Sequence, residues 1–262
     1  MKAAFQIGSG LRHFLARRKE EYSVDLPRRS RFVESMKAEE LFSLPPAFPF
    51  QDVFSLEDRP WEWVRKIKEA FSSSDFCPNG NEVPLPSGTV IEGDVFLDPS
   101  VRLAPNVVIQ GPAYIGADVQ IRPGTFIRGN VIVGQGSVLG NACEFKNSLL
   151  LEHVQAPHFN YVGDSVLGNR AHLAAGVICS NLRLDQAEVP VKLKAGVETS
   201  GLKKLGALIG DDAEVGCNTV LNPGAILGKR SLVYPSMAFG GCLDADSIVA
   251  PQPQTARIVK RR

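Results

Sequence analysis

The sequence has no long apolar run, no paired cysteine motif and almost no net charge. None of its apolar segments approaches the roughly 18 residues that a membrane-spanning helix needs, and residues 1–9 lack the layout of a signal peptide. A net charge of +1 argues against a nucleic-acid or membrane-surface protein. Five cysteines without a CxxC motif indicate a reducing compartment, so we expect a cytoplasmic protein.

What the sequence does contain is a six-residue repeat between Thr89 and Leu151. A branched apolar residue, or Phe once, stands at every sixth position: Ile91, Leu97, Leu103, Ile109, Ile115, Ile121, Ile127, Val133, Leu139, Phe145 and Leu151. A second column of smaller or branched side chains lies two residues before each of them. Six is a multiple of the strand period of two and does not fit the helical period of 3.6. The repeat is therefore typical of a parallel β-helix, whose stacked coils bury one continuous core.

The repeat divides the chain into three parts. Residues 88–250 are expected to form a mainly β domain, a parallel β-helix, and residues 251–262 a tail or capping segment. Residues 1–87 lack the repeat and are expected to be a partly helical extension with a linker. Within them, Asp58-Arg59-Pro60 and the apolar residues that follow predict a capped amphipathic helix. We expect that helix to cover the open end of the β-helix and prevent edge-to-edge growth.

Two interruptions of the repeat indicate external loops. After Leu151 the apolar column returns at Tyr161, which implies four extra residues within Ala156–Asn160. A polar stretch then interrupts it from about residue 181 to 206, after which Ile209 resumes the beat. Because a stacked coil can extrude residues only at a corner, loops are expected near 154–160 and 181–206, and such loops often carry function.

Two cations and one histidine are candidates for chemistry. Arg128 and Lys146 are 18 residues apart, which is one coil of three six-residue faces, so they should point outward side by side. No acid obviously separates them, and a phosphate would explain the pair, although two solvated surface cations are the plain alternative. His158 stands in the first predicted loop, and a histidine there could accept a proton from an attacking nucleophile.

Several motifs resemble one enzyme family. The run "LGNACEFKNSLLLEHVQAPHFNYVGDSVLGNRAHLAAGVICSN" and the later "GLKKLGALIGDDAEVGC" resemble the C-terminal acetyltransferase domain of the bacterial bifunctional enzyme that acetylates glucosamine-1-phosphate and then uridylylates it. "NLRLD" and "VLNPGAILG" resemble β-helix domains attached to sugar-phosphate nucleotidyltransferases. The resemblance implies a left-handed coil, a homotrimer, and acetyl-coenzyme A bound between neighbouring subunits.

The resemblance also implies roles for individual residues. His158 matches the general base, Arg128 and Lys146 match the residues that hold the sugar phosphate, and Tyr161 matches a substrate-contacting tyrosine. Asn181 matches an asparagine beside the acetyl thioester, and Lys204 and Cys217 fall in the coenzyme-binding part. Two positions depart from the family: His172 stands where a second substrate-binding asparagine is usual, and Leu182 where an aromatic residue is usual.

The sequence thus predicts acetyl-CoA-dependent N-acetylation of an amino-sugar phosphate such as glucosamine-1-phosphate. Residues 1–87 lack the "GxGTRM"-like loop of the nucleotidyltransferase domain, so no nucleotidyltransferase activity is expected from this chain alone, and a separate nucleotidyltransferase subunit is a candidate partner. A non-catalytic trimeric scaffold or sugar-phosphate-binding module is the main alternative. A zinc hydratase, suggested by His153-x₄-His158, is a third, although it needs another histidine from an earlier coil.

Overall fold

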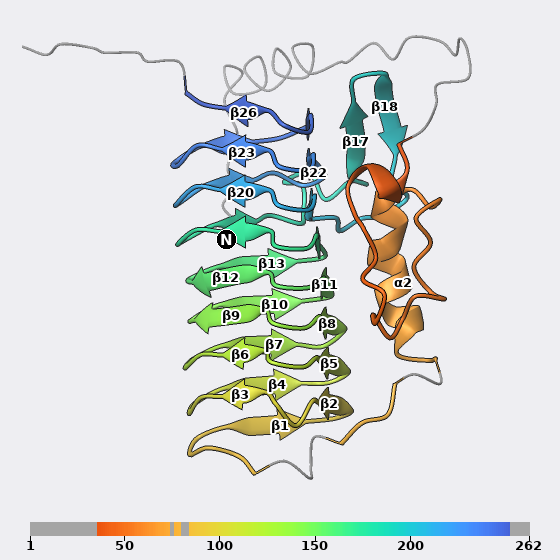
Figure 1. Cartoon of the computed structure of the whole chain (residues 1–262). Coiled ribbons are helices and arrows are strands. Elements are labelled where there is room, and N and C mark those ends of the chain that lie inside the picture. Colours follow the sequence, from red (N-terminus) through yellow and green to blue (C-terminus); the bar gives the residue numbers. More distant parts are fainter. Residues whose placement is uncertain (1–35, 74–75, 80–83, 252–262) are drawn as a thin grey trace, which may run out of the picture. The chain divides into compact units, whose positions relative to one another are not determined.

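A computed structural model describes residues 36–73, 76–79 and 84–251, and it has the expected parallel β-helix (Figure 1). Three eight-stranded parallel sheets, called here faces A, B and C, follow one another around each coil. Face A contains β1 (Val90–Glu92), β4 (Val108–Gln110), β7 (Phe126–Arg128), β10 (Glu144–Lys146), β13 (Tyr161–Gly163), β16 (Ile178–Cys179), β21 (Val220–Leu221) and β24 (Ala238–Phe239).

The other two faces repeat the same pattern. Face B contains β2 (Val95–Leu97), β5 (Ala113–Ile115), β8 (Val131–Val133), β11 (Ser148–Leu150), β14 (Val166–Leu167), β19 (Ala207–Ile209), β22 (Ala225–Leu227) and β25 (Cys242–Leu243). Face C contains β3 (Arg102–Leu103), β6 (Gln120–Ile121), β9 (Val138–Asn141), β12 (Gln155–His158), β15 (His172–Leu173), β20 (Glu214–Val215), β23 (Leu232–Val233) and β26 (Ile248–Val249).

The inward positions form one apolar core along the coil, as the repeat predicts. From Leu97 to Phe145 most members of the first column are fully buried in this core. Cys143 and Cys179 lie in it too, and complete burial raises the pKa of the Cys179 thiol to about 12. Both cysteines are therefore small core residues, as their inward positions indicated.

The prediction of an external loop near 154–160 is wrong, because Gln155–His158 form strand β12 of face C. Ala156 pairs with Leu139, 17 residues earlier, and faces the core. Inward positions continue at Leu150, Ala156 and Val162, and not at Leu151 or Tyr161.

The physical reason lies in the two corners before β11 and β14. Each is one residue shorter than the six-residue beat requires, so that Phe145 is followed inward by Leu150, and Val162 by Leu167. In a six-residue repeat, the loss of two residues places the later apolar residues at the same position within the repeat as the insertion of four residues. The apolar pattern alone could not distinguish a loop from two tightened corners.

The N-terminal segment, residues 36–73, covers face B and not the end of the coil (Figure 1). It contains two short 3-10 helices, η1 (Ala38–Glu40) and η2 (Pro60–Glu62), and the predicted amphipathic helix α2 (Trp63–Ala70). Its buried aromatic side chains share a core with outward residues of face B, namely Ile132, Leu149, Val166, Leu208 and Ile226. Face B is apolar on both sides, so it needs a cover. Residues 36–73 are therefore part of one packed structure with the coil.

Between β16 and β19 the chain leaves the coil in an excursion, residues 180–206. It carries an antiparallel hairpin of β17 (Pro190–Leu193) and β18 (Gly196–Thr199). The excursion is tied to the N-terminal segment, because Arg59 pairs with Glu198 and Arg65 Nη2 donates to the Ser200 carbonyl at 3.0 Å. Two separate parts of the chain thus hold each other beside the coil.

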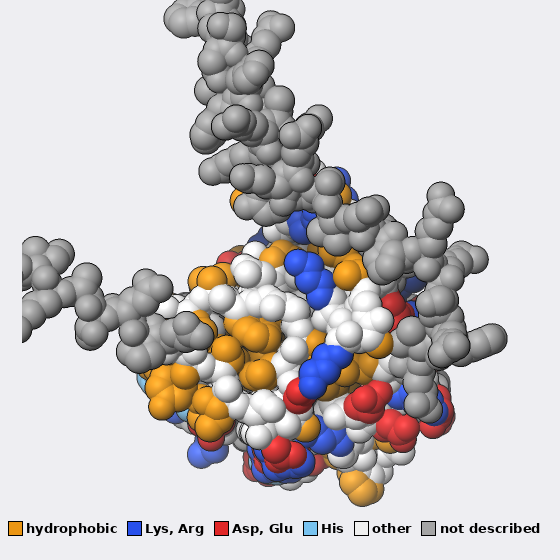
Figure 2. Space-filling view, turned by 90° about the horizontal axis from the view of Figure 1, so that it is seen from above, with side chains coloured by type: hydrophobic (Ala, Val, Ile, Leu, Met, Phe, Trp, Pro, Cys, Tyr) orange, Lys and Arg blue, Asp and Glu red, His pale blue; other side chains and the backbone are white. Residues whose placement is uncertain are grey.

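At the β26 end of the coil, hydrophobic side chains occupy the middle of the surface (Figure 2). The inward residues Phe239, Leu243 and Val249 are only partly buried there. The expected capping segment 251–262 lies outside the described residues except for Pro251, and so does the basic stretch Arg12–Arg31. Among the described residues no helix has the length and apolarity needed to cross a membrane.

Replacing Leu149 by Ala should test the cover over face B. Leu149 points away from the coil but is fully buried, so we expect the free energy of unfolding to fall by about 2–5 kcal/mol. Urea unfolding would measure it. Leu184→Ala is the control, because Leu184 is fully exposed in the excursion and its loss should change stability by no more than about 0.5 kcal/mol. Equal effects of the two substitutions would contradict the cover.

Candidate active site

The outer surface of face A carries two rows of side chains. Outward positions alternate along each strand, so the first row runs through Phe126, Glu144, Tyr161 and Ile178, which pair in register. The second row contains Arg128, Lys146 and, one coil later, Gly163, which pairs with Lys146. The register therefore brings Arg128 and Lys146 into neighbouring coils on the same face, as their spacing predicted.

Gly163 allows the two rows to meet. A Cβ atom at this position would lie 2.5 Å from the Tyr161 hydroxyl and 2.8 Å from the Asn181 amide nitrogen. Without it, the Tyr161 ring lies across the strand, and Asn181 Nδ2 is 3.3 Å from the Tyr161 hydroxyl. Burial, followed by the charges of Asp164 and Glu144, raises the pKa of Tyr161, so the hydroxyl keeps its proton at neutral pH.

Asp164 is the centre of this cluster. Its carboxylate is nearly buried and accepts hydrogen bonds from Lys146 Nζ at 3.3 Å, from Asn147 Nδ2 at 2.8 Å, and from Asn181 Nδ2. Three of the predicted site residues, Lys146, Tyr161 and Asn181, are thus gathered around one carboxylate. Asp164 was not among the residues predicted from the sequence, although it lies three residues after Tyr161 in the long family-like run that begins at Leu139.

The two cations do not lack acidic partners, contrary to the expectation from spacing. Arg128 pairs with Glu144 at 2.5 Å, and Lys146 pairs with Asp164 at 3.3 Å. Glu144, by its hydrogen bond and its charge, raises the pKa of Arg128. Glu144 stands two residues before Lys146, so strand alternation could have placed it on the same surface. The pair of cations is therefore neutralised by two carboxylates, that of Glu144 on face A and that of Asp164 at the corner after β13.

His158 ends β12 on face C, at the corner that leads to face A. Its side chain is exposed, its backbone N–H donates to Asn160 Oδ1 at 3.2 Å, and its carbonyl accepts from Gly176 at 3.0 Å. Tyr161 begins the next strand, three residues later. Since Lys146 stands at the far end of the face A strands, about 10 Å of strand separates that end from the His158 corner. Among the described residues, His158 makes no hydrogen bond or ion pair with either cation.

Phe159, next to the candidate base, has an unusual backbone. Its φ is 54°, and 57% of its surface is exposed. Each face A strand is preceded by such a left-handed corner, and the other occupants are small or polar: Gly88, Asn106, Gly124, Ala142, Gly176, Asn218 and Ser236. The conformation costs a bulky residue about 1–2 kcal/mol. Because the Phe159 ring is exposed, packing in the core does not explain why a bulky residue occupies this strained corner. The ring centroid lies 6.2 Å from that of His158. The corner is therefore a candidate for function.

The remaining predicted residues are spread over the coil. His172 lies on face C, where it pairs with Gln155 and Glu214. Cys217 is exposed at the corner between faces C and A, two coils beyond His158. Lys204 forms an isolated bridge with Leu182 in the excursion. None of these three joins the cluster around Asp164.

The zinc alternative is disfavoured by the position of its two histidines. His153 precedes β12 at a left-handed corner, and His158 ends that strand. Four strand residues span about 13 Å, too far for two ligands of one zinc ion. In the described ranges no three His, Cys, Asp or Glu side chains gather in a way that could hold a metal.

A basic hollow of about 490 Å³ lies beside the Asp164 cluster. Its lining comes from the N-terminal segment, the corners between faces A and B, and the excursion: Val64, Arg65, Lys68, Asn130, Asn147, Asp164, Leu202, Lys203 and Lys204. Among these lining residues, Lys204 is the one to which the family resemblance gave a role at the coenzyme.

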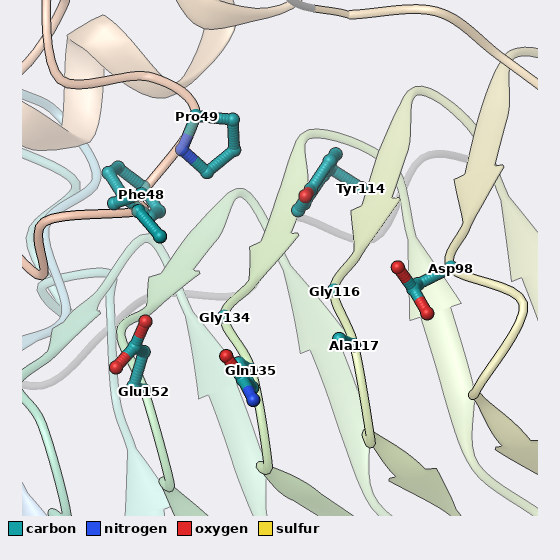
Figure 3. Close-up of a pocket in the computed structure, with 10 residues that line it drawn as sticks. Phe48, Pro49, Asp98, Tyr114, Gly116, Ala117, Gly134, Gln135 and Glu152 are labelled. Carbon is teal, nitrogen blue, oxygen red and sulfur yellow. The ribbon is translucent and has the colours of Figure 1, made fainter.

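A second hollow, of about 220 Å³, lies between Phe48 and Pro49 and the corners that follow face B (Figure 3). It contains none of the predicted site residues. Gly134 is one of its lining residues, and a Cβ atom there would lie 2.8 Å from the backbone of Leu151 in the next coil. The stacking of the coils accounts for this glycine without a ligand.

Known proteins resemble the β-helix. The family model "GMPPB C-terminal domain" matches residues 109–232. A bifunctional sugar-1-phosphate nucleotidylyltransferase/acetyltransferase of Sulfurisphaera tokodaii is 34% identical over 177 residues, which are 68% of this chain and 44% of that protein. The bifunctional protein GlmU of Methanococcus maripaludis is 34% identical over 123 residues, 47% of this chain and 29% of that protein. The resemblance read from the sequence motifs is confirmed.

The chain spans less than half the length of these two relatives. Among solved structures, the acetyltransferase domain of PglB from Neisseria gonorrhoeae, in complex with acetyl coenzyme A, is 13% identical. The match covers 72% of this chain and 62% of that one, with a TM-score of 0.24. The family model includes the Asp164 cluster and the excursion, whereas the N-terminal segment lies outside its range.

Exchanging Phe159 for Asn should test the strain at this corner. Asn occupies the same corner at Asn218 with φ 56°, so Phe159→Asn should raise the free energy of unfolding by about 0.5–1 kcal/mol. Chemical denaturation would measure it. The reciprocal variant Asn218→Phe should lower stability by a similar amount or more. A clear loss of stability in Phe159→Asn would mean that the ring packs against something and is not merely strained.

Proposed function

We propose that the protein is an acetyl-CoA-dependent N-acetyltransferase that acts on an amino-sugar phosphate such as glucosamine-1-phosphate. The observation that carries the proposal is the cluster in which Lys146, Tyr161 and Asn181 meet around Asp164 on face A. These are residues that the motif resemblance assigned to the substrates. The relative from Sulfurisphaera tokodaii carries "acetyltransferase" in its name, which supports the same chemistry.

In the proposed reaction, the amine nitrogen of the sugar attacks the carbonyl carbon of the acetyl thioester. His158 accepts the amine proton as the new C–N bond forms. The C–S bond then breaks, and the sulfur of the coenzyme leaves and takes up a proton, so that free coenzyme A and the acetamido sugar are the products. Asn181 or a backbone N–H donates to the oxygen that becomes negative during the attack.

The proposal includes a homotrimer with the coenzyme between neighbouring subunits. Because residues of the same chain cover face B, a neighbour would contact face A, face C or a corner. Such a neighbour could complete a site whose parts, the His158 corner and the Asp164 cluster, stand at the two ends of the face A strands. We also propose a cytoplasmic location, from the cysteine content.

A non-catalytic trimeric scaffold or sugar-phosphate-binding module is the second candidate. Its scaffold form is favoured by the ion pairs of Arg128 with Glu144 and of Lys146 with Asp164, because they leave neither cation unpaired for a phosphate. His172 and Leu182, which depart from the family pattern, favour it as well. The two candidates differ in whether acetyl-CoA raises the melting temperature, since only the transferase should bind it.

His158→Ala should lower the rate of free thiol release from acetyl-CoA with glucosamine-1-phosphate by about 10²- to 10⁴-fold, because it removes the proton acceptor. The matched control is His153→Asn, at the other end of β12. Asn tolerates the left-handed backbone of that corner, so this variant should keep the wild-type rate. A wild-type protein that releases thiol no faster than His158→Ala would refute the transferase.

A further inference from the structure

The basic hollow beside the Asp164 cluster is lined by four cationic side chains and by only one carboxylate. Arg65 and Lys68 of α2 and Lys203 and Lys204 of the excursion line it, against one carboxylate, that of Asp164. That carboxylate is only 5% exposed and already accepts from Lys146, Asn147 and Asn181. It is therefore not available to balance the four cations.

Three of these cations project into solvent without an acidic partner. Lys68, Lys203 and Lys204 are exposed, and none of them forms an ion pair with another residue in the described ranges. Like charges in one hollow repel each other, and an anion that enters it relieves that repulsion. On face A, in contrast, Arg128 and Lys146 each have a carboxylate.

The fourth cation holds the walls of the hollow together. Arg65 Nη2 donates to the Ser200 carbonyl at 3.0 Å. The close approach depends on Gly201, whose φ is 65° and whose missing Cβ atom would lie 2.2 Å from that nitrogen. The ion pair of Arg59 with Glu198 fastens the same two parts of the chain. These contacts hold α2 and the excursion, which carry the four cations, together around one hollow.

We propose that this hollow binds a phosphate or diphosphate group of the protein's ligands, and that α2 of the N-terminal segment supplies part of the site. Ammonium and guanidinium groups are the usual partners of such groups in proteins. Asn147 and Asp164 belong both to the hollow and to the cluster with Lys146 and Asn181, so a ligand could extend from one to the other. The inference deepens the proposed function, because coenzyme A contains a diphosphate and the amino sugar a phosphate.

The test measures binding of inorganic pyrophosphate to the full chain at low salt, by isothermal titration calorimetry. We expect Lys68→Ala and Lys203→Ala each to raise the Kd by about three- to tenfold, the range expected for loss of one charge-assisted contact. Lys192→Ala is the matched control, because Lys192 is an exposed lysine on β17 that does not line the hollow, and it should leave the Kd unchanged. No binding of pyrophosphate, or equal Kd values for Lys68→Ala and Lys192→Ala, would overturn the proposal.

Competition identifies the source of the phosphate. If coenzyme A displaces pyrophosphate and glucosamine-1-phosphate does not, the hollow takes the diphosphate of the coenzyme; the opposite result assigns it to the sugar phosphate. Displacement by neither would overturn the link to the ligands of this site. None of these measurements needs turnover, so a chain that fails the thiol-release assay but shows the Lys68 effect would refute the transferase and leave the hollow as a phosphate site.

Discussion

The position of every functional side chain in this protein depends on the number of residues in each coil. Parallel stacking sets each residue about 4.8 Å above its partner in the previous coil, and that partner lies 17 or 18 residues earlier in most of the coil. A coil of 18 residues brings Arg128 and Lys146 together on face A. The next coil has 17, and this shorter step puts Val162 into the core and turns Tyr161 outward to the cluster. One residue removed at a corner thus decides which side chains are available for chemistry.

The β-helix was predictable from the sequence because an apolar residue recurs at every sixth position many times. Which residues point inward after Phe145 was not predictable. Between Phe145 and Leu167 the sequence fits both one external loop and two shortened corners. Both interpretations return Leu167 to the core, and only the stacking partners, such as Leu139 for Ala156, distinguish them. The cover over face B was also missed, although face B strands such as Val131–Val133 have three apolar residues in succession. A middle residue with no polar character indicates burial on both sides of a strand.

The candidate site was predictable in its residue types and only partly in its electrostatics. Spacing placed Arg128 and Lys146 side by side, but Asp164 comes from a corner one coil later and Asn181 from the start of the excursion. Gly163 contributes to the site because it has no side chain. The space that a Cβ atom would occupy is needed for the Tyr161 hydroxyl to reach Asn181. Patterns of apolar and charged residues cannot reveal a position whose contribution is empty space.

The distribution of charge connects the N-terminal segment to the site. The two cations of face A are paired with the carboxylates of Glu144 and Asp164, so this surface by itself offers an anion little net attraction. The unpaired positive charge lies one corner away, on the excursion and on α2, both outside the six-residue repeat. An aromatic segment that is fastened to face B by apolar contacts therefore does more than shield the sheet, because the same packing that buries Trp63 and Ile67 points Arg65 and Lys68 toward the excursion. Burial of an apolar surface and placement of a charged one are, in this helix, two consequences of the same amphipathic pattern.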